Sequence, residues 1–308
     1  HLLRFRKSLF TLLLFGLWVG TLCAQSLDIT HYQHVTGNGM SRVYAVEVFP
    51  NNDYVMVGSF QNGATIGGQA INGFGGKGVY AARFNNANQL LWVRAYGGQQ
   101  NEEAYDVALN TAGDSLFITG YFEGVSIFDQ HQMISNGGFD IFVASLNPAN
   151  GDVRWVSQAG GSDDDIAHAI VKGLGSSFLY ICGEVGDAAE FTPGAPPGSN
   201  MYVETTGGES DAFVAGLTPH LGNFIWVNAD GDDHRDVAYD LEVINDEIYV
   251  VGTFNTSMTV DNFPNTPVTT LTSLGGADFY YAQYDAFNGD ALWAKRIGNQ
   301  GEVFERPK

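Results

Sequence analysis

Three short sequence patterns occur four times each along this chain, always in the same order, and this repetition constrains the fold more than any other feature. The first pattern places a tryptophan in an alternating segment, as in "LLWVRAYGG" and "VRWVSQAGG". Successive tryptophans are 63, 71 and 67 residues apart, and they are Trp92, Trp155, Trp226 and Trp293. Repeats of this length indicate structural units that bury their apolar faces by stacking on one another.

The second and third patterns predict β-strands. The second is an apolar run with a central glycine, as in "VMVGSF", and its four glycines are Gly58, Gly120, Gly183 and Gly252. The third begins with a glycine pair, as in "GGFDIFVASL". In the second repeat, segments rich in Val, Ile, Phe, Tyr and Thr predict strands at about 104–110, 115–122, 139–146 and 152–158. No segment keeps a 3.6-residue apolar period, so the sequence predicts an all-β protein.

The four predicted strands of a repeat, named A to D in chain order, differ in character. Strand B is almost continuously apolar, which is typical of a strand covered on both faces. Strand D carries basic residues that disfavour pairing at an outer edge, and these are Arg94, Arg154, Lys295 and Arg296. Radial stacking covers both faces of every sheet, so the sequence predicts a β-propeller with four four-stranded blades, part of a larger ring. The tryptophans and the central glycines are expected to be structural anchors of these blades.

The order of the motifs resembles a known family. The arrangement "DxFVAxL–NPxxG–xxW–xxxGG–acidic–strand–G–D–xxYVxGxF" resembles the bacterial seven-bladed β-propeller repeat (SBBP) of secreted and cell-surface proteins, from about Arg42 to the C-terminus. The first repeat departs from it, with Gly78 where Asp140 and Asp278 stand in later repeats. A weaker similarity to quinoprotein-like propeller repeats lies in the Gly-turn-Trp element "NGDALW". These resemblances imply a propeller and export, but no single activity.

Residues 1–24 have the layout of a secretory signal peptide, with a basic start, an apolar core at 9–19 and a cleavage position before Gln25. The mature chain is therefore expected to be secreted or displayed at the cell surface, as a monomer without a membrane span. We expect a partial propeller at 25–308: an N-terminal closing strand and loop at 25–41, repeats at 42–103, 104–165, 166–236 and 237–302, and the start of a further blade at 303–308. The natural protein is expected to continue, with its last blade completed by Leu27–Thr36.

The negative charge of the chain argues against anionic partners. Without the three basic residues of 1–24, 11 Lys and Arg stand against 34 Asp and Glu, a net charge of −23. Nucleic acids and anionic membranes need clustered basic residues, so neither is an expected partner. Cys182 is the one cysteine after residue 24, and its apolar segment "LYICGEV" predicts a buried thiol.

Acidic residues are concentrated in the loops from strand D to the next strand A and at the starts of the C strands. In an antiparallel meander these positions share one face with the long B–C connections, where a rigid scaffold usually carries its binding loops. The candidate binding residues on this face are Asp140, Asp163, Asp164, Asp165, Asp211, Asp232, Asp233, Asp236 and Asp278. One hypothesis is that they hold Ca²⁺, which prefers oxygen ligands. The alternative is that they cap turns through Asx-type bonds. No other metal or cofactor is predicted.

The sequence shows no catalytic constellation. The histidines lack HxH or HExxH spacing, and neither a G-x-S-x-G elbow nor a phosphate-binding loop is present. These features predict an exported, non-catalytic binding or adhesion scaffold that holds a polysaccharide or a protein on its acidic loop face. Two alternatives stay open: a carbohydrate-active or quinoprotein-type propeller enzyme, and a structural cell-surface spacer.

Overall fold

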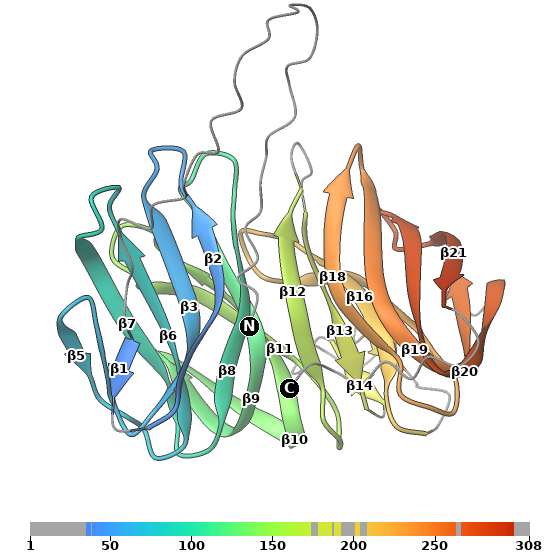
Figure 1. Cartoon of the computed structure of the whole chain (residues 1–308), viewed down its shortest axis with the longest axis horizontal. Helices are drawn as coiled ribbons and strands as arrows, with labels where there is room; N and C mark the ends of the chain where they lie inside the picture. Colours follow the sequence, from blue (N-terminus) through green and yellow to red (C-terminus); the bar gives the residue numbers. More distant parts are fainter. Residues whose placement is uncertain are drawn as a thin grey trace, which may run out of the picture.

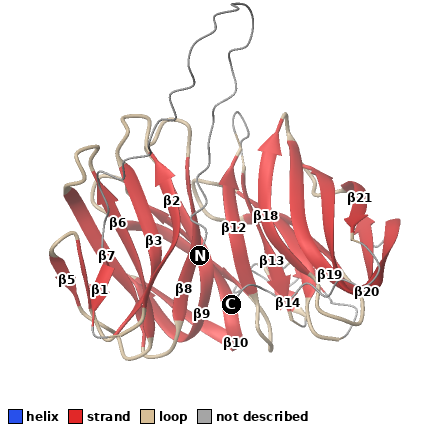
Figure 2. Ribbon diagram, in the orientation of Figure 1, coloured by secondary structure: helices blue, strands red, loops and turns tan. Residues whose placement is uncertain are grey.

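The computed structural model describes residues 35–298, apart from 38, 174–177, 187, 192–200, 204–207 and 263–265. The predicted signal peptide, most of the predicted closing strand and the segment 303–308 lie outside the described residues. Every regular element in the described residues is a β-strand (Figure 2), which confirms the all-β prediction. The described part of the chain contains no helix that could cross a membrane.

Four antiparallel meanders of strands A, B, C and D follow one another along the described chain, and the first two are joined into one eight-stranded sheet by pairing of β7 with β9. Blade 1 consists of β2 (Ser41–Val48), β3 (Tyr54–Gln61), β6 (Lys77–Phe84) and β7 (Leu90–Gly98). Blade 2 consists of β8 (Glu102–Leu109), β9 (Leu116–Phe128), β10 (His131–Leu146) and β11 (Val153–Ala159). Blade 3 consists of β12 (Ile166–Lys172), β13 (Leu179–Val185), β16 (Asp211–Leu217) and β17 (Phe224–Asp230). Blade 4 consists of β18 (Val237–Ile244), β19 (Glu247–Asn262), β20 (Thr266–Asp285) and β21 (Ala291–Ile297).

The blades stack face to face and follow a curved, open arc, with blade 1 and blade 4 at its two ends (Figure 1). The first strands of neighbouring blades are in contact: β2 with β8, β8 with β12, and β12 with β18. One apolar core fills each of the three seams between blades. Cys182 is buried in the core between blades 3 and 4. This arrangement confirms the predicted β-propeller architecture.

The expectation of long irregular B–C loops is wrong for blades 2 and 4. There, strands B and C continue past the blade as one regular hairpin, β9–β10 or β19–β20. The extension in blade 2 reads "EGVSIF", and it buries Ser126 and Phe128 between exposed neighbours. This period-2 alternation is that of a half-buried strand. Blade 1 carries a separate small hairpin instead, β4 (Ala64–Ile66) with β5 (Gln69–Ile71). Blade 3 carries β14 (Ala189–Glu190) with β15 (Tyr202–Val203).

These hairpins link each blade to the one before it through backbone pairing. The residue seven positions after a central glycine pairs with a glycine at or just after the end of the preceding strand D, in Gly97–Ile127, Gly160–Glu190 and Gly231–Thr259. Strand β1 (Val35–Gly37) pairs with β4 in the same register, through Thr36 and Thr65. The β1 strand therefore occupies the place that follows strand D in the complete repeats.

The central glycines of the B strands have a common steric cause. In each blade, a Cβ atom at Gly58, Gly120, Gly183 or Gly252 would lie within 2.0 Å of a carbonyl oxygen of strand A. Strand A carries a β-bulge at this point, so its backbone approaches strand B closely. The residue at each bulge is aromatic or a histidine, and the four are Tyr44, Tyr105, His168 and Tyr239.

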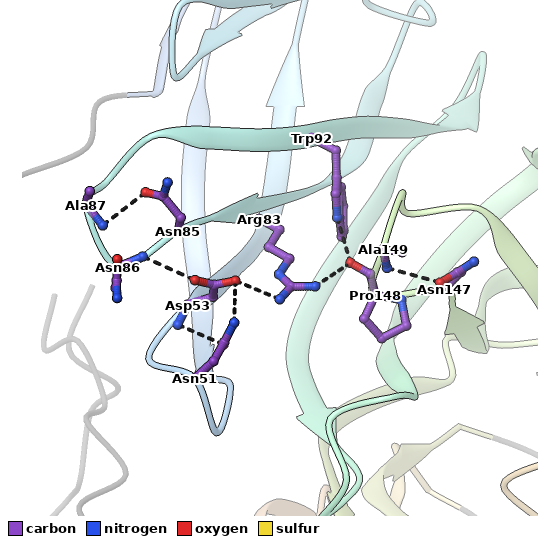
Figure 3. Close-up of polar contacts among 10 residues, drawn as sticks. All are labelled: Asn51, Asp53, Arg83, Asn85, Asn86, Ala87, Trp92, Asn147, Pro148 and Ala149. Carbon is purple, nitrogen blue, oxygen red and sulfur yellow. Dashed lines mark hydrogen bonds and ion pairs between the residues drawn. The ribbon is translucent and has the colours of Figure 1, made fainter.

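The tryptophans of the D strands reach across the seams. The indole Nε1 of Trp92 donates to the carbonyl oxygen of Pro148 in the C–D turn of blade 2, at 2.8 Å. Arg83 donates to the same oxygen at 2.9 Å and forms an ion pair with Asp53 at 2.7 Å (Figure 3). Trp155 makes the equivalent bond to Pro219 of blade 3, at 3.1 Å. The indole therefore connects strand D of one blade to the turn of the next.

A glycine in each receiving turn makes room for the indole. Gly151, Gly222 and Gly289 have φ angles of 78°, 71° and 77°, a left-handed conformation that favours glycine. A Cβ atom at any of them would lie 2.9 Å or less from the tryptophan ring of the preceding blade. A larger residue would therefore both strain the turn and displace the indole.

Candidate functional site

The structure gives two of the predicted acids a backbone-holding role. Asp165 is buried, and its carboxylate accepts from the amides of Gly161 (2.6 Å) and Gly186 (3.0 Å). Asp236 occupies the same place one blade later and accepts from Asp232 (3.1 Å) and Asn255 (3.0 Å). Each carboxylate therefore joins the D–A loop to the end of the following strand B.

The acids at the starts of the C strands are also buried. Asp140, Asp211 and Asp278 lie against the glycine that follows strand D in their own blade, where a Cβ atom would come within 2.5 Å of the carboxyl carbon. Asp140 accepts from the amide of Asn136 at 3.0 Å, and Asp278 accepts from Leu274 at 2.9 Å. The carboxylates of Asp140 and Asp278 thus hold the backbone four residues before them, as the Asx-type alternative proposes.

Burial raises the pKa of several of these acids, because a charged carboxylate is poorly solvated there. The pKa is about 7 for Asp140 and Asp165 and about 8 for Asp236, in each case against the hydrogen bonds that lower it. The other predicted residues lie nearer the surface. Asp163, Asp164 and Asp233 are exposed, while Asp232 accepts from Ser257 and from the amide of Asp233.

The predicted acids do not converge on one metal site. In the described residues, no group of three or more His, Cys, Asp or Glu side chains could hold a metal ion. We expect calorimetric titration of residues 25–308 with Ca²⁺ to give no binding heat, and Ca²⁺ to leave the melting temperature unchanged, since the buried carboxylates of Asp140, Asp165 and Asp236 already bind backbone amides. Saturable heat together with a higher melting temperature would restore the calcium hypothesis.

The loop face contains a pocket of about 480 Å³ that blade 2, blade 3 and the loops at the two ends of blade 3 border. Asp163 and Asp164 are the two predicted binding residues that line it. The complete lining is Gly138, Ser162, Asp163, Asp164, Ile166, Glu184, Gly186, Glu209, Ser210 and Arg235. The pocket therefore collects chain segments from blade 2, blade 3 and the loop that enters blade 4.

A buried carboxylate organises the floor of this pocket. Glu184, next to the central glycine of blade 3, binds Arg235 through both oxygens, at 2.7 and 2.5 Å. Ser210 donates to it at 2.9 Å, and the Nε2 atom of His168 lies 3.1 Å away. Such a two-oxygen Arg–carboxylate pair fixes the guanidinium plane as well as its position.

The partners of Glu184 decide its protonation. Burial alone would raise its pKa, but the hydrogen bonds and charges of His168 and Arg235 outweigh burial and lower the pKa to about 2. Glu184 is therefore ionised at every physiological pH. Three exposed carboxylates remain at the rim, those of Asp163, Asp164 and Glu209, so the pocket carries an excess of negative charge.

The residues at the four bulges form a second feature, which the sequence analysis missed. Ring centroids lie 4.8 Å apart between Tyr44 and Tyr105, 5.7 Å between Tyr105 and His168, and 5.4 Å between His168 and Tyr239. We call this row the axial aromatic row. It runs across the first strands of all four blades and reaches the pocket through the contact of His168 with Glu184.

A signal for this row was present in the sequence. A ring follows three positions after the acid of each D–A loop, in "EEAY", "DIAH" and "DVAY". In blades 3 and 4 this acid, Asp165 or Asp236, holds the loop through backbone amides, and the bulge then presents the ring on strand A. Glu184 and Arg235 had no comparable signal, since their pairing depends on the approach of two blades.

Comparisons with known proteins add little beyond the fold. No family model and no curated protein matches the sequence. The structure is similar to a quinohemoprotein alcohol dehydrogenase from Comamonas testosteroni, at 10% identity and a TM-score of 0.40, over 83% of this chain and 46% of that one. It is also similar to the Dos1 propeller (10%, TM-score 0.31, over 85% and 70%) and to BamB from Moraxella catarrhalis (10%, TM-score 0.20, over 82% and 98%).

The chain spans less than half the length of the dehydrogenase. At 10% identity, no activity of these proteins can be assigned to this chain. Its class, an all-β protein of the propeller type, is defined by its own four blades and by the three seams between them.

Proposed function

We propose that this chain is an exported, non-catalytic binding scaffold of the propeller type, and that the pocket on its loop face holds the ligand. The observation that carries the proposal is the pocket itself, in which exposed carboxylates surround a fixed Glu184–Arg235 pair on a frame of blades 2 and 3 and the loop that enters blade 4. Sites on such frames keep their polar groups in place before the ligand arrives, which lowers the entropic cost of binding.

The chemistry of the rim favours a ligand rich in hydrogen-bond donors. Carboxylates accept hydrogen bonds but donate none, so Asp163, Asp164 and Glu209 suit hydroxyl groups. The guanidinium of Arg235 is already paired with Glu184 and offers little to an anion. A neutral or amino-sugar polysaccharide therefore fits the pocket better than a uronate or sulfated one. A basic protein segment is the alternative ligand.

A glycan array with the mature chain tests the proposal. We expect signals on neutral or amino-sugar oligosaccharides and none on anionic ones. By calorimetry with the oligosaccharide that gives the strongest signal, Asp163→Asn combined with Glu209→Gln should weaken binding at least tenfold, roughly the loss of one or two hydrogen bonds to charged groups.

The matched control is Asp246→Asn combined with Glu242→Gln, which makes the same charge change of two at exposed positions in and beside the A–B turn of blade 4, on the opposite face. Its affinity should equal that of the unchanged chain. An array without any glycan signal, or equal weakening by control and pocket variants, would overturn the glycan assignment. Release of reducing sugar from the bound glycan would contradict the non-catalytic part of the proposal.

A further inference from the structure

Blade 4 exposes a face that the other blades bury. Cys182, one position before the central glycine of blade 3, is fully buried under blade 4, whereas Val251 at the same repeat position of blade 4 is 50% exposed. Phe279 is 40% exposed, although its equivalents Val79, Ile141 and Ala212 are at most 2% exposed. Residues of the same repeat position are thus core in three blades and surface in the fourth.

This face also carries the polar groups with which strand D binds a neighbouring blade. In blades 1 to 3, the residue two positions after the tryptophan donates to a carbonyl of the next C–D turn. These bonds are Arg94 to Asn150 (2.9 Å), Ser157 to Gly222 (2.7 Å) and Asn228 to Gly289 (3.1 Å). Blade 4 has Lys295 in this position, beside Trp293. It therefore presents both an indole and an ammonium donor with no turn to receive them in the described residues.

The three occupied seams specify what would fit this face. The turn that receives the indole has a glycine at positive φ, and a Cβ atom on that glycine would meet the ring at 2.4 to 2.9 Å. In two seams the carbonyl three residues before this glycine accepts the indole N–H. A fitting partner thus combines an apolar sheet face with a C–D turn that carries glycine at this position.

Blade 1 does not meet this specification, so a second copy of the chain in head-to-tail order is the wrong partner. Its C–D turn has Asn88 at the glycine position, also at positive φ, with a side chain that accepts from the Tyr54 hydroxyl at 3.0 Å. A tryptophan ring placed as in the other seams would overlap with this side chain.

We infer that the exposed face of blade 4 is a docking surface for a further blade of the same repeat, carried by the natural protein and bearing a glycine in its C–D turn. The contact repeats the three seams already present. Trp293 packs on the turn glycine, Lys295 binds a turn carbonyl, and Val251 and Phe279 enter a fourth apolar core.

Thiol reactivity in the protein expressed from its complete natural gene tests this inference. The variant Val251→Cys, made with Cys23→Ser, places a thiol at the repeat position that Cys182 occupies one blade earlier. We expect the introduced thiol to react with a maleimide as slowly as Cys182, at least a hundredfold more slowly than in urea. Leu292→Cys is the matched control, since Leu292 is 46% exposed and its equivalent Leu91 in blade 1 is 49% exposed. It should react fast.

Rapid labelling of the Val251→Cys variant in its folded state would overturn the inference. Protection that disappears on dilution would also overturn it, because it would assign the face to a second copy in another orientation. If Val251→Cys does not fold, maleimide labelling of Phe279→Cys tests the same face from strand C. The result does not depend on the glycan assays, because the pocket lies on the loop face and not in this seam.

Discussion

Replacing Gly222 with alanine is expected to lower the free energy of unfolding by about 2–4 kcal/mol, from the cost of a left-handed non-glycine residue and of overpacking. Gly222 has a φ of 71°, and a Cβ atom there would lie 2.5 Å from the Trp155 ring and 2.4 Å from the Ser157 hydroxyl. The indole must leave the seam between blades 2 and 3, and its bond to Pro219 is lost with it. Urea unfolding of the mature chain measures the effect.

Asn88→Gly is the control at the same repeat position, where no indole packs in the described structure. We expect it to change stability by less than about 1 kcal/mol, since glycine accepts the positive φ and one part-buried hydrogen bond is lost. A loss of less than about 1 kcal/mol for Gly222→Ala, no larger than that of the control, would contradict the assigned packing of the indole on this turn.

Acidification from pH 8 to pH 5.5 is expected to raise the melting temperature by at least about 4–8 °C, from the usual size dependence of thermal unfolding. Five buried carboxyl groups have a raised pKa, chiefly because burial disfavours their charge. The pKa is about 7 for Asp140, Asp165 and Asp230, and about 8 for Glu102 and Asp236. Calorimetric melting curves across this pH range test the prediction.

The sign of the effect follows from proton binding. Between about pH 4 and pH 8 the folded chain binds more protons than the unfolded one, so stability falls as the pH rises. The destabilisation is absent below the pKa of the unfolded carboxyl group and complete above that of the folded one. One group with a folded pKa of about 7 contributes about 2 kcal/mol between pH 5.5 and pH 8, which alone accounts for the expected minimum.

Asp140→Asn is the matched variant for this prediction. One oxygen of Asp140 accepts from Asn136, and the other has no hydrogen-bond partner among the described residues, so a neutral amide can occupy the site. The variant should be more stable than the unchanged chain at pH 8 and similar to it at pH 5.5. A melting temperature that rises with pH would contradict the assignment of these acids as buried and largely protonated.

Local patterns in the sequence were enough to predict the blades. Strand B is apolar along its whole length because it lies at the centre of a sheet with a neighbour on each face, and "LYICGEV" in blade 3 is buried throughout. Turn residues are equally local, since Gly151 and Gly222 are required by the φ angle of their own turns. Because the same patterns occur in the same order in four repeats, the order of the strands within a blade could also be predicted.

The site was less predictable because it depends on contacts between distant segments. Glu184 and Arg235 are 51 residues apart in the chain, and the contact joins strand B of blade 3 to the loop that enters blade 4. Acidity alone did not separate Asp163, which lines the pocket, from Asp165 two residues later, which is buried and holds two amides. The β-bulges were missed although each carries an aromatic residue or a histidine, because the sequence does not show where the pairing of strands A and B skips a residue.

The pairing of each B–C hairpin with a glycine at or just after the end of the preceding strand D has a consequence for how such a chain can change in length during evolution. A deletion that removes one sheet from its A strand to its D strand also removes the hairpin that holds its predecessor and the glycine that holds its successor. The glycine of the preceding blade must then pair with the hairpin of the following blade. It can do so because the three hairpin–glycine pairings of the described blades share one register. Recombination can therefore add or remove whole blades without a change in the backbone pairing between neighbouring blades.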